Sequence, residues 1–238
     1  MNIQILKTYD EISQYAGDII ADIVSKKPDA ILGLATGSTP LGVYKYLIDQ
    51  KLDFKKVTTF NLDEYVGLEK TDPQSYHYYM KEHFFDHINI DPANTNIPNG
   101  KAKNPEIEAA EFDAKIVALG GVDVQILGIG ENGHIGFNEP AEDFKIHTFV
   151  TDLATSTINA NSRYFEKIED VPTRAITMGI GTIMRAKKII LIANGPKKAE
   201  AIASVLNKNV HPQTQASILN FHPDVTVLLD EAAASLVS

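Results

Sequence analysis

The chain of 238 residues contains no cysteine and no tryptophan. Without cysteine it can form no disulfide framework, no thiolate metal site and no cysteine nucleophile, so any catalysis must rest on acid–base or hydroxyl groups. Basic residues are also few, because 22 Lys and Arg stand against 31 Asp and Glu and leave a net charge of −9. This charge repels polyanions and anionic membranes, so we expect no nucleic acid and no membrane as partners.

Long apolar runs are absent as well. No run of about eighteen apolar residues, the minimum for a membrane-spanning helix, occurs in the chain. Acidic residues such as Asp10, Glu11 and Asp18 interrupt the N-terminal region, where a secretion signal needs an apolar core. We therefore expect a cytoplasmic protein. Its hydrophobic fraction of 44% indicates one large globular domain over residues 1–238.

Short apolar runs alternate with segments of helical periodicity along the chain. The expected strands are 2–7, 30–35, 57–62, 122–129, 188–193 and 225–229, and the expected helices are 10–26, 41–48, 72–84, 104–119, 196–206 and 230–236. This alternation predicts an α/β fold, a single three-layer, Rossmann-like domain with a central, mainly parallel sheet flanked by helices. Ligands of such folds bind beyond the carboxyl ends of the strands. The more polar stretch 151–174 is a candidate mobile lid.

The segment Thr36–Pro40 joins an expected strand to an expected helix. Gly37 allows the backbone to approach an anion closely, and the hydroxyl groups of Ser38 and Thr39 can donate hydrogen bonds to it. The following helix directs its free N–H groups toward the same place. These features are compatible with a phosphate site, and equally with a turn followed by an ordinary helix cap.

Two acidic residues, Asp63 and Glu64, follow the expected strand 57–62. A carboxylate at a strand end, shielded from water in a cleft, has the raised pKa that a general base needs near neutral pH. An exposed acidic loop is the alternative, and these two residues taken alone favour it.

The loop Gly128–Pro140 contains Gly-x-Gly-x-x-Gly directly after an expected strand. We reject a dinucleotide site, because that motif needs a helix at its last glycine, whereas residues 134–140 are rich in glycine, asparagine and proline. The loop instead displays His134 five residues before Glu139, a pair suited to proton transfer. A histidine that only caps a turn is the alternative.

Other polar residues carry weaker signals. His83 and His87 have the i, i+4 spacing of helical metal ligands, but no glutamate follows the first and their neighbours are aromatic, so we expect packing rather than zinc binding. We expect core packing for the aromatic cluster at 76–79 too. Arg163 and Lys198 could each clamp a phosphate, although most single cations are solvated surface charges.

Taken together, several blocks resemble the glucosamine-6-phosphate deaminase family. They are Thr36–Pro40, Phe60–Gly67, Gly128–Pro140 and Ala160–Arg163, and the match covers nearly the whole chain. The resemblance implies an α/β fold and the conversion of glucosamine 6-phosphate and water to fructose 6-phosphate and ammonia. The partner is then a small-molecule sugar phosphate, and neither a metal nor an organic cofactor is implied.

The resemblance also assigns roles to residues. Asp63 matches the base that moves the C2 proton of the opened sugar to C1, His134 the ring-opening histidine, and Glu139 the carboxylate that supports it. The residues matched to phosphate binding are Gly37, Ser38, Thr39, Arg163 and Lys198.

Two departures from the family pattern stand out. Asn132 occupies a position where many members have aspartate, and an amide neither titrates nor holds negative charge, so Glu139 alone would tune His134. The chain also ends soon after Leu236, whereas the longer, allosteric members continue. We expect weak or no activation by N-acetylglucosamine 6-phosphate, and a monomer or small homo-oligomer.

Two other functions remain open at this point. A 6-phosphogluconolactonase-like hydrolase would share the phosphate loop and the Gly-His block, but it needs no base at C2, so the Asp63–Tyr65 block favours the deaminase. A non-catalytic sugar-phosphate sensing module would need none of Asp63, His134 and Glu139.

Overall fold

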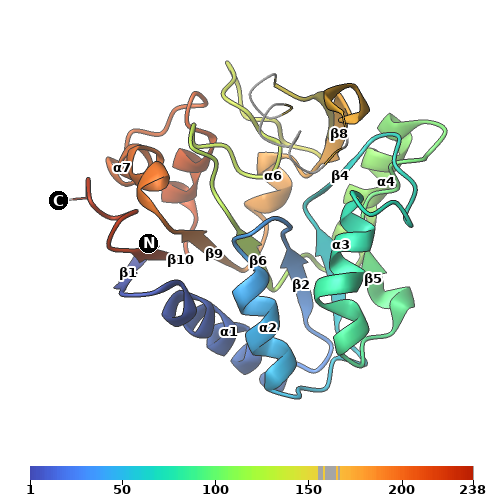
Figure 1. Ribbon diagram of the computed structural model, residues 1–238, viewed down its shortest axis with the longest axis horizontal. Coiled ribbons are helices and arrows are strands. Elements are labelled where there is room, and N and C mark those ends of the chain that lie inside the picture. Colours follow the sequence, from blue (N-terminus) through green and yellow to red (C-terminus); the bar gives the residue numbers. More distant parts are fainter. Residues whose placement is uncertain (155–157, 159–164, 166, 238) are drawn as a thin grey trace.

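The computed structural model describes residues 1–154, 158, 165 and 167–237. Its main sheet has seven strands in the order β1-β10-β9-β6-β2-β3-β5, and each neighbouring pair is parallel (Figure 1). These strands are β1 (Asn2–Leu6), β2 (Ile31–Leu34), β3 (Thr58–Asn61), β5 (Thr95–Asn96), β6 (Val124–Leu127), β9 (Lys188–Ala193) and β10 (Val225–Asp230). The expected central, mainly parallel sheet is confirmed.

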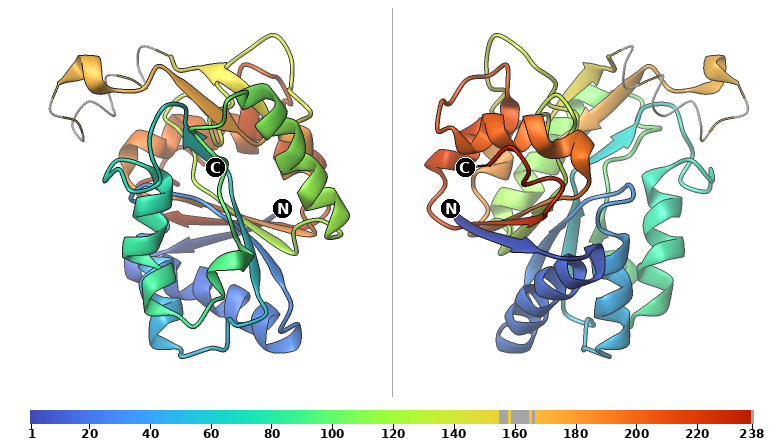
Figure 2. Two further views of the ribbon diagram at one scale, coloured as in Figure 1. Left: turned by 90° about the vertical axis from the view of Figure 1, so that its right-hand side faces the viewer. Right: turned by 60° about the vertical axis from the view of Figure 1, so that its left-hand side comes forward.

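Helices cover both faces of this sheet, as Figure 2 shows. One face carries α1 (Tyr9–Lys26), α2 (Leu41–Asp49) and α3 (Tyr76–His83), and the other carries α4 (Pro105–Ala118), α6 (Ile180–Ile183) and α7 (Ala199–Leu206). Successive residues of β9 alternate between the two apolar cores, Ile190 facing α1 and Leu191 facing α7. Because each strand is buried on both sides, its sequence reads as a continuous apolar run. No helix of the described ranges is long and apolar enough to cross a membrane.

A second, smaller sheet was not predicted. It is antiparallel and contains β4 (Asp63–Tyr65), β8 (Arg174–Thr177) and β7 (Phe149–Asp152), in that order. The chain passes into it directly from β3, with Leu62 O accepting a hydrogen bond from the N–H of Met178 at 2.7 Å. The segments 63–65 and 149–152, for which the sequence predicted no strand, therefore pair in a separate sheet.

Two helix predictions were wrong in detail. We expected Asp72–Pro73 to begin the third helix, but Ser75 is its N-cap and accepts a hydrogen bond from the N–H of Tyr78 at 3.1 Å. The expected helix at 230–236 is also absent, because Asp230 ends β10 and residues 231–236 form turns. There the side chain of Asp230 accepts a hydrogen bond from the N–H of Ala233 at 2.7 Å, which favours a turn at the end of β10.

An ion cluster holds the amino edge of the sheet together. Asp123, which is 7% exposed, accepts hydrogen bonds from Lys27 Nζ at 2.7 Å, Lys187 Nζ at 2.8 Å and the N–H of Ile31 at 2.7 Å. Burial acts to raise the pKa of this carboxyl, but the bonds from Lys187, Lys27 and Ile31 outweigh it and the pKa lies below its ordinary value. The ionised carboxylate therefore stabilises the junction of β2 and β6.

We expect Asp123→Ala to lower the free energy of unfolding by roughly 1–3 kcal/mol at pH 7, because the buried N–H of Ile31 loses its acceptor. The difference from wild type should shrink as the pH falls below about 4, because protonation then removes the same charge from wild type. Urea unfolding at several pH values measures both effects. Asp22→Ala, which breaks an exposed Lys26–Asp22 pair, is the control and should cost below about 0.5 kcal/mol; an equal loss in both variants would contradict the prediction.

Candidate active site

The chain changes direction along the sheet between β2 and β6. From β2 it proceeds to β3 on one side, and from β6 to β9 on the other, so these two neighbours form the topological switch point at which α/β folds bind ligands. The loops that leave them, Thr36–Pro40 and Gly128–Pro140, meet there. A Cβ atom on Gly128 would lie only 3.5 Å from Thr39 Oγ1.

The Thr36–Pro40 loop has an open, polar surface. Gly37 has φ +86°, a conformation that favours glycine, and a Cβ atom there would meet no neighbour within 4 Å. Gly37 and Ser38 are exposed, and α2 begins at Leu41 directly after the loop. The glycine therefore serves the backbone conformation, and the loop keeps room for a ligand at a helix N-terminus.

Asp63 is the first residue of β4 and is 7% exposed. Burial, and then the neighbouring charge of Glu64, raise the pKa of Asp63 to about 8. The carboxyl lies beside the loop that leaves β6, since a Cβ atom on Gly136 would be 3.6 Å from Asp63 Oδ2. At neutral pH such a group has access to both its protonated and its ionised form, which is what proton transfer requires.

Glu64, the other acid of this pair, has a different environment. It is 1% exposed, and its carboxylate accepts hydrogen bonds from the N–H groups of Tyr65 at 2.8 Å, Tyr76 at 3.0 Å and His77 at 3.1 Å. Its Oε2 also lies 2.9 Å from His77 Nδ1. Glu64 therefore binds the N-terminus of α3 to β4 and fixes the backbone that carries Asp63.

His134 and Glu139 face each other within the Gly128–Pro140 loop. His134 Nδ1 lies 3.3 Å from Glu139 Oε2, which is an ion-pair distance, although the two groups are not aligned as a hydrogen bond. The imidazole rests against Gly130, where a Cβ atom would come within 2.3 Å of ring atom Cε1. Only glycine at position 130 leaves space for the ring in this place.

Asn132 connects the two members of this pair. Its Nδ2 donates to Glu139 Oε2 at 2.7 Å, and its Oδ1 accepts from the N–H of His134 at 3.2 Å. Glu139 Oε2, the oxygen that lies 3.3 Å from His134 Nδ1, is thus the same oxygen that accepts the hydrogen bond from Asn132. An ionised aspartate at position 132 could not donate this bond and would place a second negative charge beside Glu139.

The far end of the loop is tied to the small sheet. The N–H of Phe137 donates to Thr177 Oγ1 at 3.1 Å, and Asn138 Nδ2 donates to Met178 O at 2.8 Å. Thr177 pairs directly with Asp63 across the sheet. The loop that carries His134 and the strand that carries Asp63 are therefore anchored to the same strand, β8.

The remaining predicted site residues are two cations. Lys198, in the short helix η5 (Pro196–Lys198), is half-buried, and burial, the largest cause, lowers its pKa while Glu131 opposes the shift. Its neighbour Lys197 lies 3.7 Å from Glu131 Oε1, which places η5 beside the Gly128–Pro140 loop. Arg163 lies outside the described residues. The structure thus gathers Asp63, the His134 loop and the Thr36–Pro40 loop at one edge, with Lys198 next to them.

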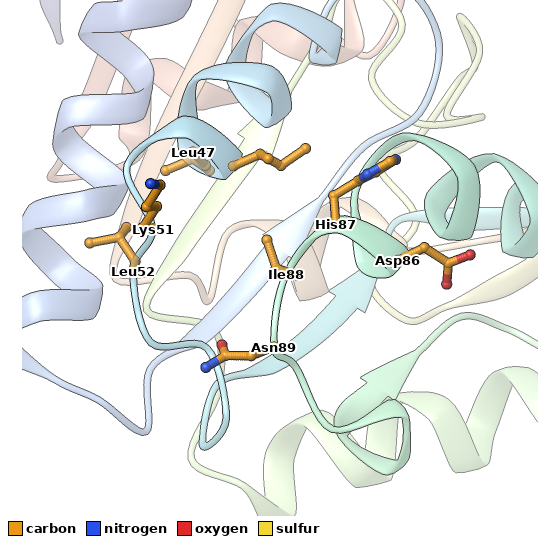
Figure 3. A pocket seen from close by; sticks show the side chains of 8 residues that line it. Leu47, Lys51, Leu52, Asp86, His87, Ile88 and Asn89 are labelled. Carbon is orange, nitrogen blue, oxygen red and sulfur yellow. The ribbon is translucent and has the colours of Figure 1, made fainter.

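Two other features lie away from this edge. α3 ends at His83, so His83 and His87 do not share one helix as expected; His87 belongs to η1 (Phe85–His87). A cavity of about 440 Å³ lies between the end of α2 and η1, and Figure 3 shows the side chains that line it. Because α2 runs from the carboxyl edge of the sheet back toward the amino edge, this cavity is remote from the gathered residues.

Comparison with known proteins gave consistent matches. The sequence profile of the family described as glucosamine-6-phosphate isomerases/6-phosphogluconolactonase matches residues 7–227. A glucosamine-6-phosphate deaminase of Thermoanaerobacter pseudethanolicus is 51% identical, covering 100% of this chain and 95% of the relative, and one of Clostridium botulinum is 52% identical, covering 99% and 98%. A solved structure described as a monomeric glucosamine-6-phosphate deaminase has a TM-score of 0.96 at 49% identity, covering 99% of this chain and 100% of that one. The 6-phosphogluconolactonase of Trypanosoma brucei, 20% identical with a TM-score of 0.79, shares the fold, covering 100% of this chain and 98% of that one.

The buried carboxyl of Asp63 predicts an unusual pH dependence of stability. Between the ordinary Asp pKa and about 8 the folded state keeps a proton that the unfolded chain has released, so the free energy of unfolding falls as the pH rises. Asp63→Asn removes this titration. We expect the free energy of unfolding of Asp63→Asn to rise relative to that of wild type by up to about 1.4 kcal/mol for each pH unit over that range.

Urea unfolding at half-unit pH steps measures the gain. Asp22→Asn, at an exposed position, is the control and should run parallel to wild type. If Asp63→Asn also ran parallel to wild type, the carboxyl would have an ordinary pKa.

Proposed function

Because the chain belongs to the glucosamine-6-phosphate isomerase/6-phosphogluconolactonase family, we propose that Asp63, His134 and Glu139 are the acid–base groups of its deaminase reaction. The enzyme converts glucosamine 6-phosphate and water to fructose 6-phosphate and ammonia. The observation that carries the assignment of residues is the buried Asp63, with a pKa of about 8, beside the loop that displays His134.

The first step is opening of the sugar ring. A base takes the proton of the C1 hydroxyl, the C1–O5 bond breaks, and O5 receives a proton. His134 suits this exchange, because an imidazole can both accept and donate a proton, and Glu139 Oε2 lies 3.3 Å from its Nδ1. Asn132 keeps the carboxylate of Glu139 in place during the exchange.

The second step moves a proton within the open chain. The ionised carboxylate of Asp63 takes the proton from C2, O1 gains a proton, and the enolamine forms; Asp63 then returns its proton to C1 and leaves an iminium group at C2. Water adds to C2 and ammonia departs, which gives the ketone. A carboxyl with a pKa of about 8 can serve as base and then as acid.

The substrate's phosphate binds, in this proposal, at the Thr36–Pro40 loop. Gly37, Ser38 and Thr39 offer backbone N–H and hydroxyl groups at the start of α2, and Lys198 supplies positive charge beside the neighbouring loop. The phosphate contact of Arg163 remains a prediction from the sequence.

The lactonase alternative is less well supported. Lactone hydrolysis needs no base at C2, whereas here Asp63 is buried, close to the His134 loop and fixed through Glu64. The lactonase structures share only about 20% identity and support the fold alone.

Finer expectations on organisation also remain proposals. We propose a monomer or small homo-oligomer, and the support is that a solved relative at 49% identity is described as monomeric. Four further points stay predictions from the sequence. They are a single domain over 1–238, a lid around 151–174, a cytoplasmic location, and weak or no activation by N-acetylglucosamine 6-phosphate.

The decisive assay follows ammonia and fructose 6-phosphate made from glucosamine 6-phosphate. Wild type should form both in equal amounts, and Asp63→Asn should lower kcat by at least about 100-fold, because no other group then moves the C2 proton. Asp22→Asn, far from the site, should match wild type. If Asp63→Asn kept its turnover, the base would lie elsewhere, and hydrolysis of 6-phosphogluconolactone would be measured next.

The pH profile of kcat/KM tests the state of Asp63. Activity should rise as the pH approaches about 8, because the base must be ionised in the free enzyme. Glu64→Gln removes a neighbouring negative charge, which lowers the pKa of Asp63 and shifts the rising limb to lower pH. Glu69→Gln is an exposed control. If the rising limb of the kcat/KM profile lay at the same pH in Glu64→Gln as in wild type, Asp63 would not be the group whose ionisation limits activity.

A further inference from the structure

Two tyrosine hydroxyls hold the carbonyl groups of the Thr36–Pro40 loop. Tyr79, on α3, donates its Oη hydrogen to Gly37 O at 2.6 Å. Tyr9, on α1, has its Oη 2.8 Å from Thr39 O and 3.0 Å from Ser38 O, and shares its hydrogen between them. The sequence analysis did not single out Tyr9, and it included Tyr79 only in an aromatic cluster expected to pack in the core.

The two helices reach the loop from opposite sides. α2 lies between α1 and α3 (Figure 1), and the loop precedes its first residue, Leu41. Tyr9 Oη also accepts a hydrogen bond from the N–H of Gly42 at 2.8 Å, so the same hydroxyl fixes the first turn of α2. The loop is thus held at its glycine end by α3 and at its helix end by α1.

The geometry of the peptide bond gives these contacts a consequence. The carbonyl and N–H of a trans peptide unit point in opposite directions. When Gly37 O and Ser38 O are directed toward the tyrosines, the N–H groups of Ser38 and Thr39 are directed away from them. A loop that binds an anion needs this arrangement, because N–H groups attract the anion and carbonyl oxygens repel it.

We propose that Tyr9 and Tyr79 are positioning residues that orient the Thr36–Pro40 loop for the substrate's phosphate. The inference rests on the proposed function of that loop. Neither hydroxyl needs to touch the substrate, since each acts by holding a carbonyl outward before the ligand arrives. Pre-orientation of this kind improves binding by lowering the ordering cost at the moment of association.

Tyr9→Phe and Tyr79→Phe test the proposal, because each keeps the ring and removes only the hydroxyl. We expect each to raise KM for glucosamine 6-phosphate and the inhibition constant of inorganic phosphate together, by roughly two- to tenfold, which is the usual effect of one hydrogen bond. kcat at saturating substrate should stay within about twofold, because the reacting carbons are held elsewhere.

Tyr46→Phe is the matched control. Tyr46 lies on α2, and its hydroxyl donates to Asp18 Oδ1 on α1 at 2.5 Å, so the variant also loses a bond between two helices without touching the loop. It should leave KM and the phosphate inhibition constant at wild-type values. Urea unfolding of all variants separates lost stability from lost phosphate binding.

Ser38→Ala separates this inference from the assignment of the loop itself. If Ser38→Ala weakens phosphate binding and both tyrosine variants bind like wild type, the loop binds phosphate but the positioning role is overturned. If all three bind like wild type, the phosphate lies elsewhere and both proposals fall. If the tyrosine variants lose stability and kcat with no parallel rise in the two constants, the hydroxyls are merely structural and the inference is overturned.

Discussion

β2 and β6 are neighbours in the sheet, but the chain leaves them toward opposite sides. The connections that follow β2 and β6 therefore lead away from each other, and the space between the carboxyl ends of the two strands is left open. The loop that leaves each strand borders this space. The site depends on this constraint. The Thr36–Pro40 loop, the Gly128–Pro140 loop and the start of β4 come from distant parts of the sequence and meet only because parallel strands deliver them to one edge.

The adjacent acids Asp63 and Glu64 show how local surroundings separate two identical functional groups. Alternation along β4 sends their side chains to opposite faces. The carboxylate of Glu64 accepts hydrogen bonds from two N–H groups at the N-terminus of α3 and lies 2.9 Å from His77 Nδ1. The other meets little but burial and its neighbour's charge, which raise its pKa. One acid thus becomes a structural anchor, and the other has the raised pKa that the proposed proton transfer requires.

The sequence predicted six of the seven strands of the main sheet and most helices, because strands buried on both faces and amphipathic helices leave strong periodic signals. It missed β5, which has only two residues, Thr95 and Asn96. The sequence also identified the Thr36–Pro40 loop, Asp63 and the His134 loop, which the structure brings together. Each of them follows an expected strand, and their glycine, hydroxyl, acidic and histidine residues are recognisable there. The small sheet was missed because β4 is short and polar, and because β8, the strand with which it pairs, lies far along the chain. Tyr79 was expected only to pack in a core; its hydroxyl contact, like that of Tyr9, depends on tertiary distances that no local pattern encodes.

The burial of Asp63 has a consequence for the conditions under which the protein works. Protonation of that carboxyl favours the folded state, whereas the proton abstraction proposed for Asp63 needs the carboxyl ionised. At the other edge of the sheet, the paired Asp123 is stabilising only while charged. These two carboxyls therefore favour the folded state most in mildly acidic solution, where Asp123 is ionised and Asp63 protonated, whereas the proposed base acts at a pH near or above 8. In the proposed mechanism, the burial that raises the pKa of one carboxyl thus sets the pH that favours folding apart from the pH that favours proton abstraction.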